Sequence, residues 1–271
     1  MQKYRIPQGS SVVNGYVSAR QQKEVRARCT DAEWQARVDL AACYRLADMF
    51  GFSDVIWNHI TAKVPGAEEF LINRFGFRYD EVTASNLVTI DLDGNVIDAG
   101  SATSEVDVNR TGFVIHSAVH AARPEICCVM HSHSAAGMAV SALKDGLVPM
   151  TIDAMAFYGR VAYHDFEGLS TDTAERARLA DNLGDRKAMI LRNHGLLTCG
   201  ETVGEAFMKM YYLERACQVQ MQVLASGQPV ELPAPGVCER AAQQSLEFPH
   251  GKFEWPALVR MVEKVAPDYL T

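Results

Sequence analysis

Two apolar segments that lead into histidine constrain the fold of this chain more than any other feature. Segment 126–130 runs into His131 and His133, and segment 188–191 is closely followed by His194. Both segments have the length and composition of buried strands. Because residues two apart on a strand point to the same side, His131 and His133 can bind one ion together, and His194 offers a third nitrogen. The chain is therefore predicted to fold around a sheet that carries a divalent metal site.

Three histidine ligands leave coordination positions open, which is typical of a catalytic centre rather than a structural one. Gly195, directly after the third histidine, is expected to let the backbone turn as the side chain of His194 enters the site. Imidazole binds zinc, iron, copper and nickel and tolerates manganese, so the ligands do not select the metal. The alternative is that the His131 and His133 pair only marks a half-exposed strand end.

Composition argues against several classes of partner. The 271 residues are 48% hydrophobic and 22% charged, with a formal net charge of -7, which fits a globular enzyme and argues against a nucleic-acid or anionic membrane partner. No apolar run approaches the roughly 20 residues of a membrane span, and the start of the chain lacks the apolar core of a signal peptide. Seven cysteines without a CxxC motif are expected to be reduced and buried, which favours the cytoplasm.

Hydrophobic periodicity predicts a mixture of helices and strands. Helices are expected at 31–50, 113–122 with Thr111 as the N-cap, 134–143, 171–183, 201–226 and 255–265. Besides the two strands that lead to the histidines, strands are expected at 56–64, 70–72, 87–91 and 96–97, the last two forming a hairpin. The predicted organisation is an N-terminal arm over 1–30, one domain over 31–227, and a C-terminal extension over 228–271 that packs on the same domain.

The stretches VNRTGFVIHSAVHAARPEICCVMHSHSAAGMAVSAL and AMILRNHGLLTCGETVGEAF resemble the class II aldolase/adducin family, in its adducin-head-like branch. The similarity runs from about Trp34 to Ser226. It implies an α/β (α+β) fold of three αβα layers with a mostly antiparallel central sheet. It also implies one divalent ion per subunit, Mn²⁺ or Zn²⁺ with Fe²⁺ as an alternative, bound by His131, His133 and His194. A homotetramer with active sites between subunits is the assembly that the resemblance implies.

The departures from the family pattern bear on the reaction. Aldolases of this family carry an acid/base glutamate nineteen residues before the first metal-binding histidine, and here that position is Gly112. Their phosphate-binding GNxS, Thr-Gly and Ser-Ser turns correspond to Trp57-Asn58-His59-Ile60-Thr61, Phe75-Gly76 and Arg110-Thr111. A phenylalanine in place of a small donor excludes a phosphate by its size. By resemblance, we expect neither a phosphosugar aldolase nor a pentose-phosphate epimerase.

The altered turns predict a different substrate. Arg74 and Arg110 are fork-shaped donors that suit a carboxylate, and aromatic side chains beside them can form the walls for a flat ring. A small carboxylated aromatic or heteroaromatic acid is the expected substrate. The predicted substrate-binding residues are Asn58, Arg74, Phe75, Gly76, Arg110 and Thr111, with Trp57 and Phe77 as further walls. The alternative is that the arginines are solvated and the aromatics belong to the core.

A metal-dependent carbon–carbon lyase is the function that these residues predict, and decarboxylation is its favoured form. Decarboxylation needs an electron sink and a proton donor but no base that removes a carbon-bound proton, so it tolerates Gly112. His164, with Asp165 beside it, is the first candidate for the donor and His59 the second. The alternative for His164 is a hydrogen-bonded residue at a strand end. The remaining candidates, with weaker support, are His116, His120 and Glu105.

Three other functions remain open at this point. Retro-aldol cleavage of a non-phosphorylated substrate uses the same metal site. A non-haem iron oxygenase is the second alternative, and metal identity separates it from a lyase because zinc does not support oxygen chemistry. The third is a non-catalytic interaction module like the adducin head.

Overall fold

The computed structural model describes residues 18–102, 108–168 and 174–271. Its centre is one eight-stranded sheet in the order β4-β3-β2-β1-β5-β8-β7-β6. All neighbouring strands are antiparallel except β6 and β7, which are parallel. The strands are β1 (Ile60–Lys63), β2 (Phe70–Ile72), β3 (Val88–Ile90), β4 (Val96–Asp98), β5 (Cys128–Ser132), β6 (Val161–His164), β7 (Ala188–Leu191) and β8 (Gly195–Gly200). The mostly antiparallel sheet predicted from the sequence is confirmed.

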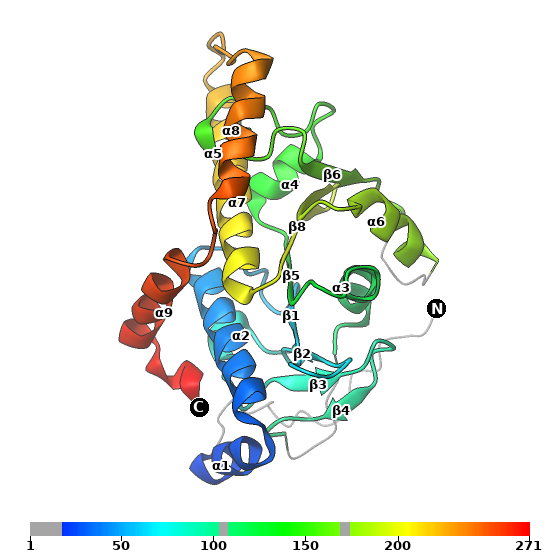
Figure 1. Ribbon diagram of the computed structural model, residues 1–271, viewed down its shortest axis with the longest axis vertical. Helices are drawn as coiled ribbons and strands as arrows, with labels where there is room; N and C mark the ends of the chain where they lie inside the picture. Colours follow the sequence, from blue (N-terminus) through cyan, green and yellow to red (C-terminus); the bar gives the residue numbers. More distant parts are fainter. Residues whose placement is uncertain (1–17, 103–107, 169–173) are drawn as a thin grey trace.

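Helices cover both faces of the sheet (Figure 1). Within the described ranges the α-helices are α1 (Ala19–Arg28), α2 (Asp31–Met49), α3 (Arg110–Ala122), α4 (Ala135–Ser141), α5 (Ile152–Met155), α6 (Glu175–Leu183), α7 (Val203–Ala225), α8 (Pro235–Glu247) and α9 (Glu254–Val265). Two 3₁₀ turns, η1 (Tyr79–Glu81) and η2 (Pro267–Leu270), complete the elements. Helices α2 and α7 lie on one side of the sheet and α3 and α6 on the other, so the three-layer αβα arrangement is also confirmed.

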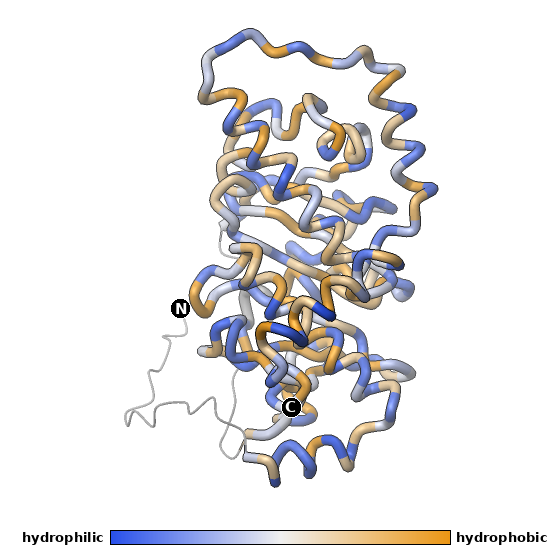
Figure 2. Tube along the Cα trace, turned by 90° about the vertical axis from the view of Figure 1, so that its left-hand side faces the viewer, coloured by the Kyte–Doolittle hydropathy of each residue, from blue (hydrophilic) through white to orange (hydrophobic). Residues whose placement is uncertain are grey.

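Strand β5 shows how the sequence directs these layers. Cys128 and Met130 belong to the core beneath α2 and α7, whereas Val129 between them belongs to the core beneath α3 and α6. This alternation follows from the two-residue repeat of a strand with both faces buried. Figure 2 shows hydrophobic and hydrophilic residues interspersed along the helices of the described part of the chain.

Several predicted boundaries were wrong. Part of the predicted polar arm is helix α1, because Ser18 and Gln21 form a capping box that starts it. Helix α8 was missed because it follows a proline-rich connector, although proline is well tolerated in the first helical turn. Strand β1 begins only at Ile60, and the residues before it form turns. The N-cap of α3 is Asn109 rather than Thr111.

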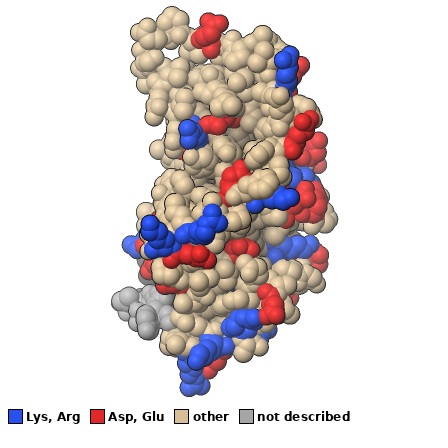
Figure 3. All heavy atoms as spheres, turned by 60° about the vertical axis from the view of Figure 1, so that its left-hand side comes forward, with Lys and Arg blue, Asp and Glu red and all other residues tan. Residues whose placement is uncertain are grey.

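Charged side chains of both signs are mixed on the surface (Figure 3). On the face drawn in Figure 3, positive and negative side chains are interspersed, with no large area of one sign. Among the described residues, no helix has both the length and the apolar character needed to cross a membrane. The seven cysteines are free thiols, five of them buried and two half-buried.

Candidate metal centre

The strand ends bring the three predicted histidines together. His131 lies within β5, His133 follows that strand directly, and His194 precedes β8, which pairs with β5. The Nε2 atom of His133 is 2.9 Å from Nε2 of His131 and 2.9 Å from Nε2 of His194. One ligand atom from each ring lies within 4.8 Å of the other two. The sequence prediction of a three-histidine cluster therefore agrees with the geometry.

Hydrogen bonds at Nδ1 of His131 and of His133 determine the protonation state of the Nε2 atoms that face each other. Nδ1 of His131 lies 2.9 Å from the carbonyl oxygen of Leu196, and Nδ1 of His133 lies 3.0 Å from Oδ2 of Asp54. Neither acceptor carries a proton to give, so both Nδ1 atoms donate. Both Nε2 atoms then carry lone pairs although they are only 2.9 Å apart. A cation between them resolves this repulsion, which is why the residues fit a divalent metal ion.

Burial keeps the cluster in the metal-binding state. Loss of hydration, and then the neighbouring rings of His194 and His133, hold the pKa of His131 well below its ordinary value. Burial, followed by the electrostatic effect of the neighbouring His133 ring, lowers the pKa of His194 to about 4. Since only neutral imidazole binds a metal, protons compete weakly with a metal ion at neutral pH.

Strained backbone surrounds the cluster. The non-glycine residues with positive φ in the described ranges are Val55, Asn58 and Asn193, at 52°, 67° and 56°. All three lie in the two turns that carry Asp54 and His194. A β-branched residue such as Val55 adopts this conformation only when its surroundings enforce it, and such strain is concentrated at functional sites.

Gly195 has a different role from the one predicted. The left-handed turn before His194 is made by Asn193, so the glycine is not the turning residue. A Cβ atom on Gly195 would lie 2.3 Å from the carbonyl oxygen of Ser132, the residue between the two histidines of β5. Gly195 therefore permits the close approach of β8 to β5 that brings His194 to the cluster.

The turn after α2 carries a second group of site residues. Asp54 of this turn contacts His133, and Asn58 lies four residues further on, 3% exposed. Neither the amide nitrogen nor the amide oxygen of Asn58 has a hydrogen-bond partner among the described residues. A buried amide without partners is unfavourable, so Asn58 is a strong candidate for contact with a ligand. Asp54 was not singled out from the sequence, because an isolated aspartate carries no pattern.

The predicted substrate-binding loop lies against this turn. The ring of Phe75 is 5.6 Å from that of Trp57, which is 42% exposed, and Gly76 has a φ of 93°. Arg74 is half-buried with its guanidinium 4.7 Å from the ring of Phe77, and burial lowers the pKa of Arg74. Asn58, Arg74, Phe75 and Gly76 therefore lie on two adjoining loops at the edge of the cluster, whereas Phe77 is a core residue.

The other predicted substrate contacts fall on the start of α3. Arg110, Thr111 and Gly112 form its first turn, but their side chains lie outside the described part of the structure. Glu105 also lies outside it. The roles predicted for Arg110 and Thr111 therefore stay predictions.

A buried row of polar side chains extends from the cluster across the sheet. His59 is 1% exposed, with its ring centre 6.4 Å from that of His131 and 4.1 Å from that of His116. The hydroxyl of Thr61 lies 2.8 Å from Nδ1 of His116 and 2.8 Å from Nε2 of His120. Of the two predicted proton donors, His59 therefore lies beside the ring of His131.

His164, the first predicted donor, is held at the end of β6. Its Nδ1 is 2.8 Å from Oδ1 of Asn182, and its Nε2 is 3.4 Å from Oε1 of Glu175. It shares a small cavity with His194, but both ring nitrogens face other side chains. This arrangement is that of the hydrogen-bonded strand-end histidine.

One further carboxylate supports the histidine segment from behind. Glu214 of α7 is 3% exposed and accepts a short hydrogen bond from the hydroxyl of Ser134, the residue after His133. Burial raises the pKa of Glu214. The contact links α7 to the metal-binding segment, and neither residue carries a signal that sequence reasoning could use.

A three-layer αβα fold whose central sheet carries three convergent histidines, able to hold one metal ion, defines the class of protein. Residues 38–221 match the family model described as Class II Aldolase and Adducin N-terminal domain. The chain belongs to this family, as its sequence motifs predicted.

Individual relatives agree with this assignment. The chain is 44% identical to an aldolase II superfamily protein from Pseudomonas syringae, with a TM-score of 0.87 over 92% of this chain and 100% of the other. It is 33% identical to L-fuculose 1-phosphate aldolase from Glaciozyma antarctica PI12, with a TM-score of 0.77 over 90% and 94%. Alpha-adducin from Rattus norvegicus is 50% identical over 192 residues, which is 70% of this chain and 26% of that protein.

Proposed function

We propose that this protein is a divalent-metal-dependent carbon–carbon lyase that acts on a small carboxylic acid, with decarboxylation as the favoured reaction. The observation that carries the proposal is the pair of Nε2 lone pairs of His131 and His133, 2.9 Å apart, which result because acceptors on the far sides of the rings take the Nδ1 hydrogens. A bound cation supplies positive charge that polarises the substrate and stabilises the electron pair left by bond cleavage. Imidazole ligands fit Mn²⁺, Zn²⁺ or Fe²⁺.

The chain's own residues account for binding of the substrate. Asn58 offers a buried amide whose hydrogen-bonding capacity is unused, and Arg74 offers a partly desolvated guanidinium for a carboxylate. Trp57 and Phe75 lie 5.6 Å apart at the rim and suit the face of a planar ring. An aromatic or heteroaromatic hydroxy acid has both the carboxylate and the planar ring that these side chains would bind.

Two features favour decarboxylation over an enolising reaction. Gly112 stands where the family's aldolases have their acid/base glutamate, so no carboxylate at this position can remove a carbon-bound proton. A proton must afterwards reach the carbon, and we favour His59, whose ring centre is 6.4 Å from that of His131, as its donor. His164 would first have to break its contact with Glu175.

Retro-aldol cleavage is the second candidate, because the similar protein from Glaciozyma antarctica is an L-fuculose 1-phosphate aldolase. Phe75 in the predicted phosphate position still argues against a phosphorylated substrate. The two reactions differ in their products, since one releases carbon dioxide and the other a second carbonyl compound.

We also propose a homotetramer with active sites between subunits. Val55, Trp57 and Phe166 are 67%, 42% and 52% exposed in the single chain, and all three lie near the histidine cluster. Apolar rims of this kind commonly mark protein interfaces. Light scattering on the purified protein should give about four times the 29.9 kDa of one chain, and the mass of a single chain would rule out this assembly.

The deciding experiment measures metal content and products together. The protein as purified, and a His133→Ala control, are analysed for metal and then incubated with a panel of aromatic hydroxy acids while carbon dioxide, carbonyl products and oxygen are monitored. We expect about one metal ion per chain and carbon dioxide release from the unaltered protein, and neither from the control. Carbonyl products alone would indicate an aldolase, and oxygen uptake with bound iron would indicate an oxygenase. Failure to bind any metal would favour the interaction module.

A matched pair of variants tests the substrate class. Arg74→Met should raise KM for an acidic substrate about tenfold, which corresponds to the loss of one charge-assisted hydrogen bond. Arg78→Met is the control, because Arg78 is exposed and its ion-pair partner is Asp80. An unchanged KM in Arg74→Met would exclude that residue from substrate binding.

A further inference from the structure

A second, larger cavity lies away from the histidine cluster. Its volume is about 1030 Å³, and it opens between the start of β7, the end of β8, α7 and the segment that joins α8 to α9. His194 stands at the other end of β8. Six residues at about 3.3 Å each place this cavity on the order of 20 Å from the histidines. It is therefore separate from the candidate metal centre.

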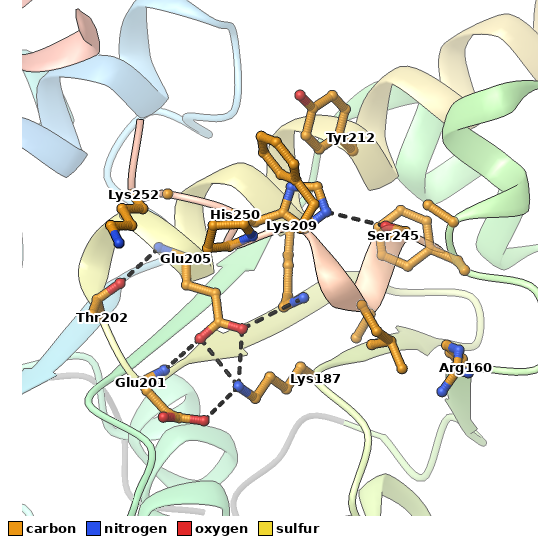
Figure 4. A pocket seen from close by; sticks show the side chains of 18 of the residues that line it. Arg160, Lys187, Glu201, Thr202, Glu205, Lys209, Tyr212, Ser245, His250 and Lys252 are labelled. Carbon is orange, nitrogen blue, oxygen red and sulfur yellow. Dashed lines mark hydrogen bonds and ion pairs between the residues drawn. The ribbon is translucent and has the colours of Figure 1, made fainter. Parts of the chain in front are cut away.

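Positive charge in the cavity is incompletely balanced. Figure 4 shows the carboxylate of Glu205 between two ammonium groups, with Lys187 at 2.9 Å and Lys209 at 3.6 Å. Lys187 has a second partner in Glu201, but that side chain is 60% exposed. Within the described ranges, the shared carboxylate is the one ion-pair partner of Lys209, whose side chain is 16% exposed and whose pKa is lowered by burial. An additional anion beside Lys209 would balance its charge.

Three more cationic side chains, those of Arg160, Arg186 and Lys252, line the same space. Arg160, labelled to the right in Figure 4, donates to the amide oxygen of Gln243, while its buried Nε has no acceptor among the described residues. Lys252 is exposed and lies 5.8 Å from the ring of Phe253. Cationic side chains outnumber carboxylates in the lining.

The remaining walls are largely apolar and rigid. Trp255 donates its indole hydrogen to Asp39 across 3.2 Å, so one of the carboxylates in the lining is already occupied. Phe157 and Phe248 add further aromatic surface. Gly251 and Gly204 are in tight backbone contact, since a Cβ on Gly251 would lie 2.5 Å from Gly204, and this fixes the joining segment against α7. Small-molecule sites typically have volumes of about 300–1,000 Å³, apolar walls and a few convergent polar groups.

We propose that this cavity is a second small-molecule site, which binds an organic anion with an aromatic or other apolar body. The acidic group of the ligand is bound by Lys209 and Arg160, and its body lies along Trp255 and Phe248. The site is independent of the metal centre and of the reaction proposed there.

The test uses two fluorescent dyes that differ in charge. The anion 1-anilinonaphthalene-8-sulfonate is titrated into the intact protein beside the neutral N-phenyl-1-naphthylamine. We expect one saturable sulfonate site per chain and much weaker binding of the neutral dye. Lys209→Met should raise the Kd of the sulfonate about tenfold, as for the loss of one charge-assisted hydrogen bond. Arg160→Met should have a similar effect and leaves the ion pairs of Glu205 with Lys187 and Lys209 intact. It replaces Lys209→Met in the test if that variant does not fold.

Two controls separate this site from other binding. Lys264→Met changes an exposed lysine on α9 that does not line the cavity, and His133→Ala disrupts the metal centre. Both should bind the sulfonate as the unaltered protein does. Equal binding of the neutral dye, loss of binding in His133→Ala, or unchanged binding in both Lys209→Met and Arg160→Met would overturn the proposal. Sulfonate binding to the dissociated chain but not to the assembled protein would also overturn the proposal. In that case a second copy of the chain fills the cavity in the assembly.

Discussion

Single ring nitrogens decide whether the cluster can bind a metal. A histidine binds a metal through a lone pair, and its other nitrogen must then hold the proton. Leu196 and Asp54 impose this state on His131 and His133. The sequence predicted the three ligands but not these supporting contacts, because a carbonyl oxygen and a lone aspartate leave no pattern to recognise.

Changing Asp54 should therefore weaken metal binding without removing a ligand. In Asp54→Asn the amide presents a weaker acceptor to Nδ1 of His133, or a donor that favours the wrong tautomer. We expect the Kd for Zn²⁺ to rise between about 10-fold and 100-fold, the usual effect of losing such a partner. Competition with a chromophoric chelator measures this, with Asp93→Asn in the β3–β4 turn as the control. Equal affinities in the two variants would show that Asp54 does not support the site.

Buried histidines should also make the fold sensitive to acid. Burial lowers the pKa of His120 to about 3, whereas an unfolded chain leaves it near 6.5. The unfolded state then binds more protons, so the stabilisation is complete above about pH 6.5 and is lost as the pH falls toward 3. Between pH 7 and pH 5 this residue alone should lower the free energy of unfolding by about 2 kcal/mol.

A comparison of pH dependences isolates this effect from that of the other histidines. His120→Gln retains a donor for Thr61 but cannot titrate. Urea denaturation at pH 7 and pH 5 should show a smaller loss of stability in the variant, by about 2 kcal/mol. An identical loss in both proteins would mean that His120 does not remain neutral in the folded state.

At the scale of elements, the sequence predicted those whose pattern is local and strong. The strand 188–191 and the long helix now seen as α7 have clear periodicity, and the structure places them within a residue or two of expectation. Residues 56–59, which belong to the turn before β1, were read as strand because their apolar residues look like the start of β1. The form of this turn depends on contacts with residues far along the chain, such as His133, and no local pattern contains that information.

Helix α2 shows how an element is fixed by a long-range polar contact. The side chain of Arg37 is 1% exposed, and its guanidinium donates to the carbonyl of Leu87 and the hydroxyl of Thr89 at β3. Glu33, one turn earlier, balances its charge at 2.9 Å. The contact anchors the helix to the half of the sheet that holds the predicted substrate-binding loop.

Removing this contact should destabilise the fold through unsatisfied acceptors. Arg37→Met keeps most of the apolar stem but leaves the Leu87 carbonyl without its donor, so we expect a loss of about 1–3 kcal/mol. Arg20→Met on α1 is the control, because Arg20 forms a solvent-exposed pair with Glu24 whose loss should leave the free energy of unfolding almost unchanged. Urea denaturation gives both values, and similar losses would show that the buried contact adds nothing.

At the scale of the whole molecule, the C-terminal extension contacts the domain at several points. Helix α9 lies beside α2 (Figure 1), and Trp255 at its start bonds to Asp39 of α2. Beyond it, backbone amides of Ala84 and Ser85 donate to the carbonyls of Tyr269 and Thr271, both at 2.9 Å. These contacts predict that residues 31–271 unfold as one cooperative unit.

Tyr269 provides the sharpest test of this cooperativity. Its side chain is 1% exposed in the core formed with α2, so Tyr269→Ala should lower the free energy of unfolding by about 3–5 kcal/mol. Leu270→Ala, at a residue 42% exposed, should change it by less than about 1 kcal/mol. In Tyr269→Ala, circular dichroism and tryptophan fluorescence should shift together, because Trp255 would unfold with the sheet. A separate early fluorescence transition with an unchanged main transition would instead show that the extension folds independently of the domain that holds the histidines.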